Sequence, residues 1–309
     1  MKFWRENWAH REELIISELK THHFVILDNF LTFRNDDAKN NFFHHISTLR
    51  DKNELIREES YMEDEETGQV TSISTNPFYT LQMTPKHFSD DEPIKNELTY
   101  FVETVGTWFQ KLLFEKIFDS TNNNIMNEAH RAGNEKENTG NTSNAESKFF
   151  FNKVALCEDF NNDLPLHFDN YSNDSRKITV VYYCTPYREE ENGENSNDLD
   201  MNGANKRNWT GGNLRIYKPS KHLYNNYWES EKLDIEPKFN RAVVFFSDTV
   251  VHGVTETLPN DSSDGYEQVP LKMSPPRTTI TTWIHCNDMS RICEDKILHQ
   301  RQMLKFFQP

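Results

Sequence analysis

Leu164-Pro-Leu-His167-Phe-Asp169-Asn is the stretch around which the rest of this chain is organised. His167 and Asp169 lie two positions apart, so on a strand both side chains leave the same face. His252, in Val250-Val-His252-Gly-Val, would add a second imidazole. Two histidines and one carboxylate occupy one face of an octahedral metal and leave the opposite positions open, which is typical of non-haem Fe(II) sites. A single His-x-Asp triplet also arises by chance on surface strands, so the surrounding sequence has to decide whether this triplet binds a metal.

Short strand patterns surround this stretch throughout the C-terminal half of the chain. They are rich in aromatic and β-branched residues and are separated by turn residues, a pattern that indicates a sandwich or a barrel. The predicted strands cover residues 149–157, 164–169, 177–185, 213–218, 242–247, 252–257 and 278–286. The sequence therefore predicts a mainly β fold.

Helical patterns precede these strands. Apolar residues recur at helical spacing over residues 8–20, 36–50 and 93–118, which predicts three helices that pack on the outside of a sheet. A short apolar run over residues 22–31 predicts a buried strand. Residues 57–92 are acidic and show little periodicity, so we expect either short strands or a flap.

Three polar segments interrupt the patterns, and the chain resumes as strand after each of them. Their low apolar content cannot offset the entropy of ordering, so we expect loops inserted into one domain. The predicted division of residues 1–309 is an N-terminal layer of helices and strands (1–118), a disordered insertion (119–148), a β core (149–286) with inserts at 188–208 and 259–276, and a C-terminal helix (287–309).

Composition excludes several classes of protein. The net charge of the 309-residue chain is −15, which argues against nucleic acid as the main partner. The four cysteines do not form a disulfide framework in a chain of this length. We find no secretory signal and no apolar run long enough to span a membrane. These features predict a protein of the cytoplasm or nucleus, and they leave its oligomeric state open.

The stretch Arg277-Thr-Thr-Ile-Thr-Thr-Trp283 adds a second chemical signal. Strand alternation puts its polar and aromatic side chains on one face: Arg277, Thr279, Thr281 and Trp283. An arginine on an inward face is costly without an anion, and a guanidinium is suited to a bidentate grip on a carboxylate. Tyr183, on the predicted strand 177–185, would donate a hydrogen bond to the same carboxylate.

In this order the motifs resemble those of the 2-oxoglutarate/Fe(II) dioxygenases. Within that family they are most similar to the cytoplasmic prolyl 4-hydroxylases that modify hypoxia-inducible factor or a ubiquitin-ligase adaptor. The resemblance covers residues 150–286 and rests on an ordered set of pieces, which is more specific than any single one. The pieces are His167-x-Asp169, Thr179-Val-Val-Tyr-Tyr183, Gly211-Gly-Asn-Leu-Arg-Ile-Tyr217, Asp234-Ile-Glu-Pro-Lys-Phe-Asn-Arg241, Val244-Phe-Phe-Ser-Asp248, His252 and Arg277-x-x-Ile-Thr-x-Trp283.

This resemblance implies a double-stranded β-helix, the jelly-roll core also found in cupins. It implies that His167, Asp169 and His252 bind Fe(II), and that Arg277 holds the distal carboxylate of 2-oxoglutarate with help from Tyr183. Thr281 and Trp283 would line the cosubstrate pocket. The cosubstrates would be 2-oxoglutarate and O2, with ascorbate as an additional reductant. Since Arg277 follows His252 by 25 positions, the third insert has to bulge outward to keep the arginine in register.

The implied activity is hydroxylation of a prolyl residue in a protein substrate, with release of succinate and CO2. Residues 57–92 would form a lid over that substrate, because loops on a rigid scaffold commonly carry recognition. Two alternatives remain open. The same chemistry could act on another target, such as 3-hydroxylation of a ribosomal protein's proline, a different side chain or a small molecule. The other alternative is a jelly-roll binding module without catalytic activity.

Overall fold

The computed structural model describes residues 2–33, 35–51, 54–58, 61–63, 70–72, 78–83, 97–112, 116–117, 150–170, 175–185, 207–218, 231–260 and 272–286. The predicted disordered insertion and the predicted C-terminal helix lie outside these residues. Most of the inserts at 188–208 and 259–276 lie outside them as well. The predicted division into core and inserts therefore stays a prediction.

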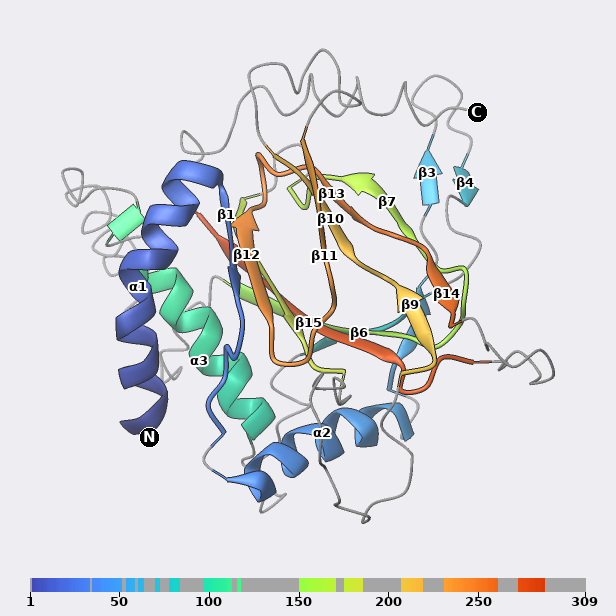
Figure 1. Ribbon diagram of the computed structural model, residues 1–309, viewed down its shortest axis with the longest axis horizontal. Helices are drawn as coiled ribbons and strands as arrows, with labels where there is room; N and C mark the ends of the chain where they lie inside the picture. The colour runs from blue at the N-terminus through green and yellow to red at the C-terminus, as the bar shows by residue number, and fades with distance from the viewer. Residues whose placement is uncertain are drawn as a thin grey trace, which may run out of the picture.

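Seven antiparallel strands form the larger sheet, in the order β1-β12-β8-β15-β6-β5-β2 (Figure 1). Its central strands β8 and β15 are buried along nearly their whole length, because helices cover one face of the sheet and a second sheet faces the other. The seven strands are β1 (Phe24–Leu27), β2 (Ile56–Glu58), β5 (Phe78–Met83), β6 (Phe150–Cys157), β8 (Arg176–Tyr183), β12 (Ala242–Phe246) and β15 (Arg277–His285).

Four strands form the smaller sheet, in the order β11-β10-β13-β7. They are β7 (Leu164–His167), β10 (Leu214–Tyr217), β11 (Lys232–Ile235) and β13 (His252–Val254). From β6 onward the chain passes repeatedly between the two sheets, and an apolar cluster joins their inner faces. The cluster includes Val181, Val243 and Phe245 of the larger sheet and Leu214, Ile216 and Ile235 of the smaller one. Two facing antiparallel sheets connected in this way form a jelly roll, so the predicted fold class is confirmed.

Three helices cover the outer face of the larger sheet (Figure 1): α1 (Lys2–His22), α2 (Asp36–Asp51) and α3 (Glu97–Leu112). All three predicted helices are present. Their buried side chains meet the outward residues of β8, β12 and β15 in one large cluster, which includes Ile15, Leu19, Phe42, Ile46, Phe101, Val105, Phe109, Ile178, Val180, Val244, Ile280 and Ile284. Leu14, one of the apolar residues of the predicted helix 8–20, is 51% exposed.

The acidic segment 57–92 is only in part a separate flap. Its strand β5 pairs with β6 and carries β2 at the edge of the larger sheet. Strands β3 (Tyr61–Glu63) and β4 (Val70–Ser72) pair with each other outside both main sheets. Of the described strands in this segment, only β3 and β4 lie outside the larger sheet.

Three strands were missed by the sequence patterns: β9 (Trp209–Gly211), β14 (Thr257–Pro259) and β11. Each has three or four residues, which is too short for periodicity to distinguish a strand from a loop. Strands β9 and β14 form a small antiparallel pair. Trp209 is fully buried there and donates a hydrogen bond to the Pro275 carbonyl, so it has a structural role.

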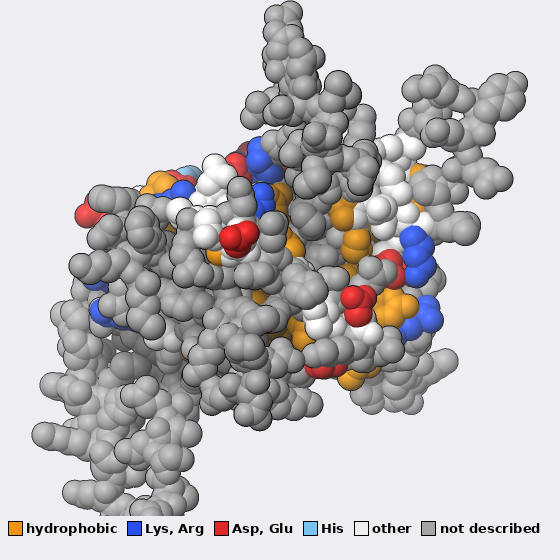
Figure 2. Space-filling model, turned by 90° about the horizontal axis from the view of Figure 1, so that it is seen from below, with side chains coloured by type: hydrophobic (Ala, Val, Ile, Leu, Met, Phe, Trp, Pro, Cys, Tyr) orange, Lys and Arg blue, Asp and Glu red, His pale blue; other side chains and the backbone are white. Residues whose placement is uncertain are grey.

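Acidic and basic side chains lie close together on the described part of the face drawn in Figure 2, with apolar side chains between them. Arg215 of β10 forms an exposed ion pair with Asp234 of β11, at 2.7 Å. Strand alternation directs Arg215 away from its buried neighbours Leu214 and Ile216, and this pairing agrees with that. Among the described residues, no helix is both long enough and apolar enough to cross a membrane.

Candidate metal and cosubstrate site

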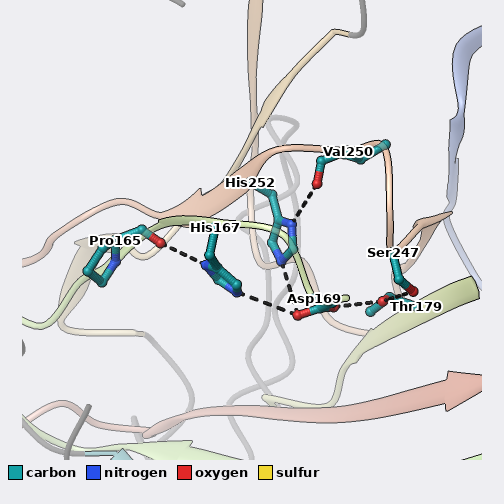
Figure 3. Close-up of polar contacts among 7 residues, drawn as sticks. All are labelled: Pro165, His167, Asp169, Thr179, Ser247, Val250 and His252. Carbon is teal, nitrogen blue, oxygen red and sulfur yellow. Dashed lines mark hydrogen bonds and ion pairs between the residues drawn. The ribbon is translucent and has the colours of Figure 1, made fainter. Parts of the chain in front are cut away.

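Three side chains meet at the open end of the smaller sheet. His167 ends β7 and His252 begins β13, and the two residues are direct partners in the antiparallel register. Asp169 lies two residues beyond His167, past the end of the strand, where the chain bends back toward both imidazoles (Figure 3). Its Oδ1 is 3.5 Å from Nε2 of His167 and 3.6 Å from Nε2 of His252. One potential ligand atom from each residue lies within 4.8 Å of the other two.

Backbone carbonyls fix both imidazoles. Nδ1 of His167 lies 2.8 Å from the Pro165 carbonyl oxygen, and Nδ1 of His252 lies 3.1 Å from that of Val250. A carbonyl oxygen only accepts hydrogen bonds, so each Nδ1 carries the proton and donates it. In the neutral ring the lone pair is then on Nε2, the atom that faces Asp169 (Figure 3). Both histidines are therefore held in the tautomer that binds metal through Nε2.

The carboxylate is held on its other oxygen. Thr179 of β8 donates a 2.6 Å hydrogen bond to Oδ2 of Asp169, and Ser247 lies 2.8 Å from the Thr179 hydroxyl (Figure 3). Asp169 is buried, which by itself raises its pKa. When the two imidazoles are protonated, the charges and the Nε2–H hydrogen bonds of His252 and His167 outweigh that effect and hold the pKa of Asp169 well below its ordinary value. The carboxyl is therefore ionised at neutral pH.

This donor set fits a divalent metal such as Fe(II). Two Nε2 lone pairs and one Oδ1 converge on the same space, and without a cation they repel one another unless the imidazoles are protonated. Two imidazoles and one carboxylate are the ligands of the non-haem Fe(II) facial site. Each ligand is also oriented by an outer hydrogen bond, as metal sites require.

A buried arginine lies on the inner face of the larger sheet. Arg277, at the start of β15, is 5% exposed. Its Nε donates a 3.0 Å hydrogen bond to the Gly212 carbonyl, and its guanidinium carbon lies 5.5 Å from the centre of the Tyr183 ring. Among the described residues, no carboxylate pairs with this guanidinium. This hydrogen bond uses Nε alone, which leaves the two terminal nitrogens available for an anion.

Tyr183 completes this corner. Its hydroxyl is buried and has no hydrogen-bond partner among the described residues. Burial raises the pKa of Tyr183, and the positive charge of Arg277 lowers it by a smaller amount. The phenol therefore stays protonated and can donate. A buried guanidinium and a phenol without a partner point to an anion that both would bind, since such groups are otherwise costly to bury.

Thr281 and Trp283 follow Arg277 on the same face of β15, as strand alternation predicts. Thr281 lies beside Val181, and Trp283 lies beside Thr179, whose hydroxyl bonds Asp169. Both side chains are only partly buried. The face thus runs from the arginine at one end of the strand to the triad at the other.

Sequence reasoning missed one contact of this site. Asn170 follows Asp169 directly and Asp248 precedes His252 by four positions, yet the hydroxyl that bonds Asp169 belongs to Thr179. Asp248 forms a 2.6 Å ion pair with Lys177. Strand alternation in 177–185 directs Thr179 to the same face as Tyr183. No sequence pattern placed Ser247 beside Thr179, because the two residues are far apart along the chain.

Comparison with known proteins agrees with this geometry. The model of the 2OG-Fe(II) oxygenase superfamily matches residues 153–285, which include the triad and Arg277. No curated protein sequence matches the chain. A prolyl hydroxylase from Trichoplax adhaerens, solved with a peptide fragment of the hypoxia-inducible factor oxygen degradation domain, has a TM-score of 0.51 and 17% identity over 92% of this chain and 94% of that chain. A prolyl-4-hydroxylase from Pseudomonas putida has a TM-score of 0.46 and 16% identity over 89% and 100%. At this identity, the likeness to the Trichoplax structure shows a shared fold.

Proposed function

Because residues 153–285 belong to the 2OG-Fe(II) oxygenase superfamily, we propose that this protein is a 2-oxoglutarate-dependent dioxygenase that hydroxylates a prolyl residue in a protein substrate. Two features on the inner side of the larger sheet carry the proposal. The first is the set of three potential metal ligands, His167, Asp169 and His252. The second is the buried Arg277, which has no carboxylate partner among the described residues. An Fe(II) enzyme with a dicarboxylate cosubstrate needs both a metal site and a cation that binds the distal carboxylate.

His167, Asp169 and His252 would hold Fe(II) through the two Nε2 atoms and Oδ1. When bound, Fe(II) supplies O2 activation coupled to decarboxylation of 2-oxoglutarate, which yields succinate, CO2 and a hydroxylated product. The protein contributes the open facial site, because three protein ligands leave positions for the cosubstrate and O2. Ascorbate would serve as an added reductant.

Arg277 and Tyr183 would bind the distal carboxylate of 2-oxoglutarate. The guanidinium offers two parallel N–H donors and the phenol a third donor, which fixes both the position and the orientation of the carboxylate. The surrounding burial strengthens these hydrogen bonds, because little water competes for them. Thr281 and Trp283 would line the pocket between the arginine and the metal.

The choice of a prolyl residue rests on the ordered sequence motifs and is supported by the Trichoplax enzyme, which was solved with a peptide. Strands β3 and β4, which pair outside the two main sheets, would cover the peptide. The strong negative charge of the chain, −15, makes nucleic acid a poor substrate.

The proposal is tested by incubating the protein with Fe(II), 2-oxoglutarate, ascorbate and a library of proline-containing peptides, with succinate and peptide mass as separate readouts. We expect succinate formation that depends on His252, and a mass increase of about 16 Da on proline, the mass of one oxygen atom. A His252→Ala variant that still binds Fe(II) and forms succinate would refute the metal assignment.

The mass shift also separates the alternatives. Hydroxylation of a residue other than proline, or of a small molecule, would keep the dioxygenase and overturn the prolyl assignment. If the wild-type protein neither binds Fe(II) nor consumes 2-oxoglutarate, the protein is a binding module.

A further inference from the structure

Two buried hydroxyl groups form a chain that ends on the carboxylate of Asp169. An ionised carboxylate only accepts, so the Thr179 hydroxyl donates its proton to Oδ2 at 2.6 Å. A hydroxyl has one proton, and therefore the 2.8 Å contact between Thr179 and Ser247 has Ser247 as the donor. The chain runs from Ser247 through Thr179 to Asp169 (Figure 3). Aligned hydrogen bonds of this kind strengthen one another in a buried site.

The backbone around Ser247 fixes the start of this chain. Its N–H donates to the Lys177 carbonyl at 3.0 Å, and its carbonyl accepts from the N–H of Asn170 at 3.1 Å. The side chain of Lys177 pairs with Asp248 at 2.6 Å, and the two are 8% and 0% exposed. The end of β12 is thus clamped to the start of β8 and to the residue that follows Asp169.

From this geometry we propose that Thr179, supported by Ser247, is a positioning residue that restricts Asp169 to binding metal through one oxygen. The hydroxyl occupies Oδ2, so only Oδ1 faces the two histidines. If both oxygens faced the metal, the carboxylate would fill a coordination position that the proposed cosubstrates need. The inference rests on the proposed function because it concerns the same site.

Packing alone does not require a hydroxyl at position 179. The residue is fully buried between strands β12 and β15, beside Phe245 and Trp283, and a valine has nearly the same shape. Thr179→Val would lose the donor to Asp169 and the acceptor for the Ser247 hydroxyl, with little change in shape. Outer partners of metal ligands typically contribute about 10–100-fold to metal affinity. The effect of this substitution on metal binding therefore reports on positioning.

The test is titration of the full-length protein, purified without metal, with Co(II), followed by visible absorption, which depends on coordination number and geometry. We expect Thr179→Val to bind Co(II) about 10–100-fold more weakly than the wild type and with an altered spectrum. Thr179→Ser keeps the donor and should restore both. Ser247→Ala removes only the supporting donor, so it should change both in the same direction by a smaller amount.

Thr282→Val is the matched control. Thr282 is also fully buried and lies on the neighbouring strand β15, but its hydroxyl bonds Asn152 at 2.6 Å on the outer face of the sheet. This variant should lose stability and keep the wild-type Co(II) affinity and spectrum. Thermal unfolding of each metal-free variant identifies any that does not fold.

The outcomes separate this inference from the function on which it rests. If wild-type protein does not bind Co(II) in a manner that depends on His252, the proposed function fails. If wild-type protein binds but Thr179→Val and Ser247→Ala, both folded, match its affinity and spectrum, the positioning role alone is overturned. The positioning role is also overturned if Thr282→Val changes the Co(II) spectrum as much as Thr179→Val does.

Discussion

Replacing Arg277 with methionine should separate cosubstrate binding from stability. The guanidinium is buried, has no carboxylate partner among the described residues and makes one 3.0 Å hydrogen bond to Gly212. A cation in this state adds a desolvation cost to the fold unless an anion binds it. Arg277→Met keeps the volume of the side chain and removes the charge. We therefore expect a large loss of 2-oxoglutarate binding without a corresponding loss of stability.

The magnitudes follow from the number of hydrogen bonds. A bidentate grip on a carboxylate contributes two hydrogen bonds between charged groups, each worth about 1.5–3 kcal/mol. Their loss, about 3–6 kcal/mol, corresponds to roughly 100-fold to 10,000-fold weaker binding of 2-oxoglutarate. In the protein without cosubstrate, the lost bond to Gly212 costs about 1 kcal/mol, and relief of the buried charge offsets it. The free energy of unfolding should therefore stay the same or rise.

Calorimetric titration of the Mn(II)-loaded protein with 2-oxoglutarate measures the first effect, and urea unfolding of the metal-free protein measures the second. Arg241→Met is the control, because Arg241 pairs with Asp28 at 2.5 and 2.9 Å in an exposed ion pair. It should lower the free energy of unfolding by about 1 kcal/mol and leave 2-oxoglutarate binding unchanged.

Two results would refute this reasoning. If Arg277→Met binds 2-oxoglutarate within a few-fold of the wild type, the arginine does not hold the cosubstrate. If Arg277→Met destabilises the metal-free protein more than Arg241→Met does, the guanidinium stabilises the fold in the absence of the cosubstrate, and its burial is no argument for an anion site.

Three further predictions concern glycines and pH. Gly212→Ala, at φ +63°, would place a Cβ 3.0 Å from the side chain of the proposed carboxylate-binding arginine, so it should weaken 2-oxoglutarate binding in calorimetry and leave Mn(II) affinity unchanged. Gly106→Ala would place a Cβ 2.3 Å from a phenylalanine ring of β6. Denaturant titration should show about 1–3 kcal/mol of destabilisation, and calorimetry should show an unchanged Mn(II) affinity. A hydrogen bond from Arg241 lowers the pKa of Asp28 below 3.8, so this pair stabilises the fold above about pH 4 and its contribution is lost as the pH falls through the lowered pKa. Unfolding curves of wild type and Asp28→Asn should therefore converge in acid, and a constant difference down to pH 2 would contradict this.

Local pattern was sufficient for the elements that extend over several turns or strand repeats. Helix α2 was predicted to within one residue, and α3 lies inside the predicted helix 93–118, because their apolar stripes repeat several times. Strands β6, β8 and β15 were found in the same way. The short strands β9, β11 and β14 were not, because three or four residues are too few for periodicity to distinguish a strand from a loop. For the acidic segment 57–92 the sequence left short strands and a flap open, and the pairing of β5 with β6 places β5 in the larger sheet.

The sequence by itself determined the chemistry of the protein: two imidazoles, a carboxylate and an arginine, in an order that resembles one superfamily. These are properties of residue type and spacing. The jelly roll expected from them is confirmed, and the model of the 2OG-Fe(II) oxygenase superfamily matches residues 153–285. Only the tertiary structure decided which atoms face the metal and which hold the ligands. The hydroxyl chain to Asp169 and the pairing of Arg277 with the Gly212 carbonyl join strands that are far apart in the chain. Such contacts depend on sheet register, which no local pattern encodes.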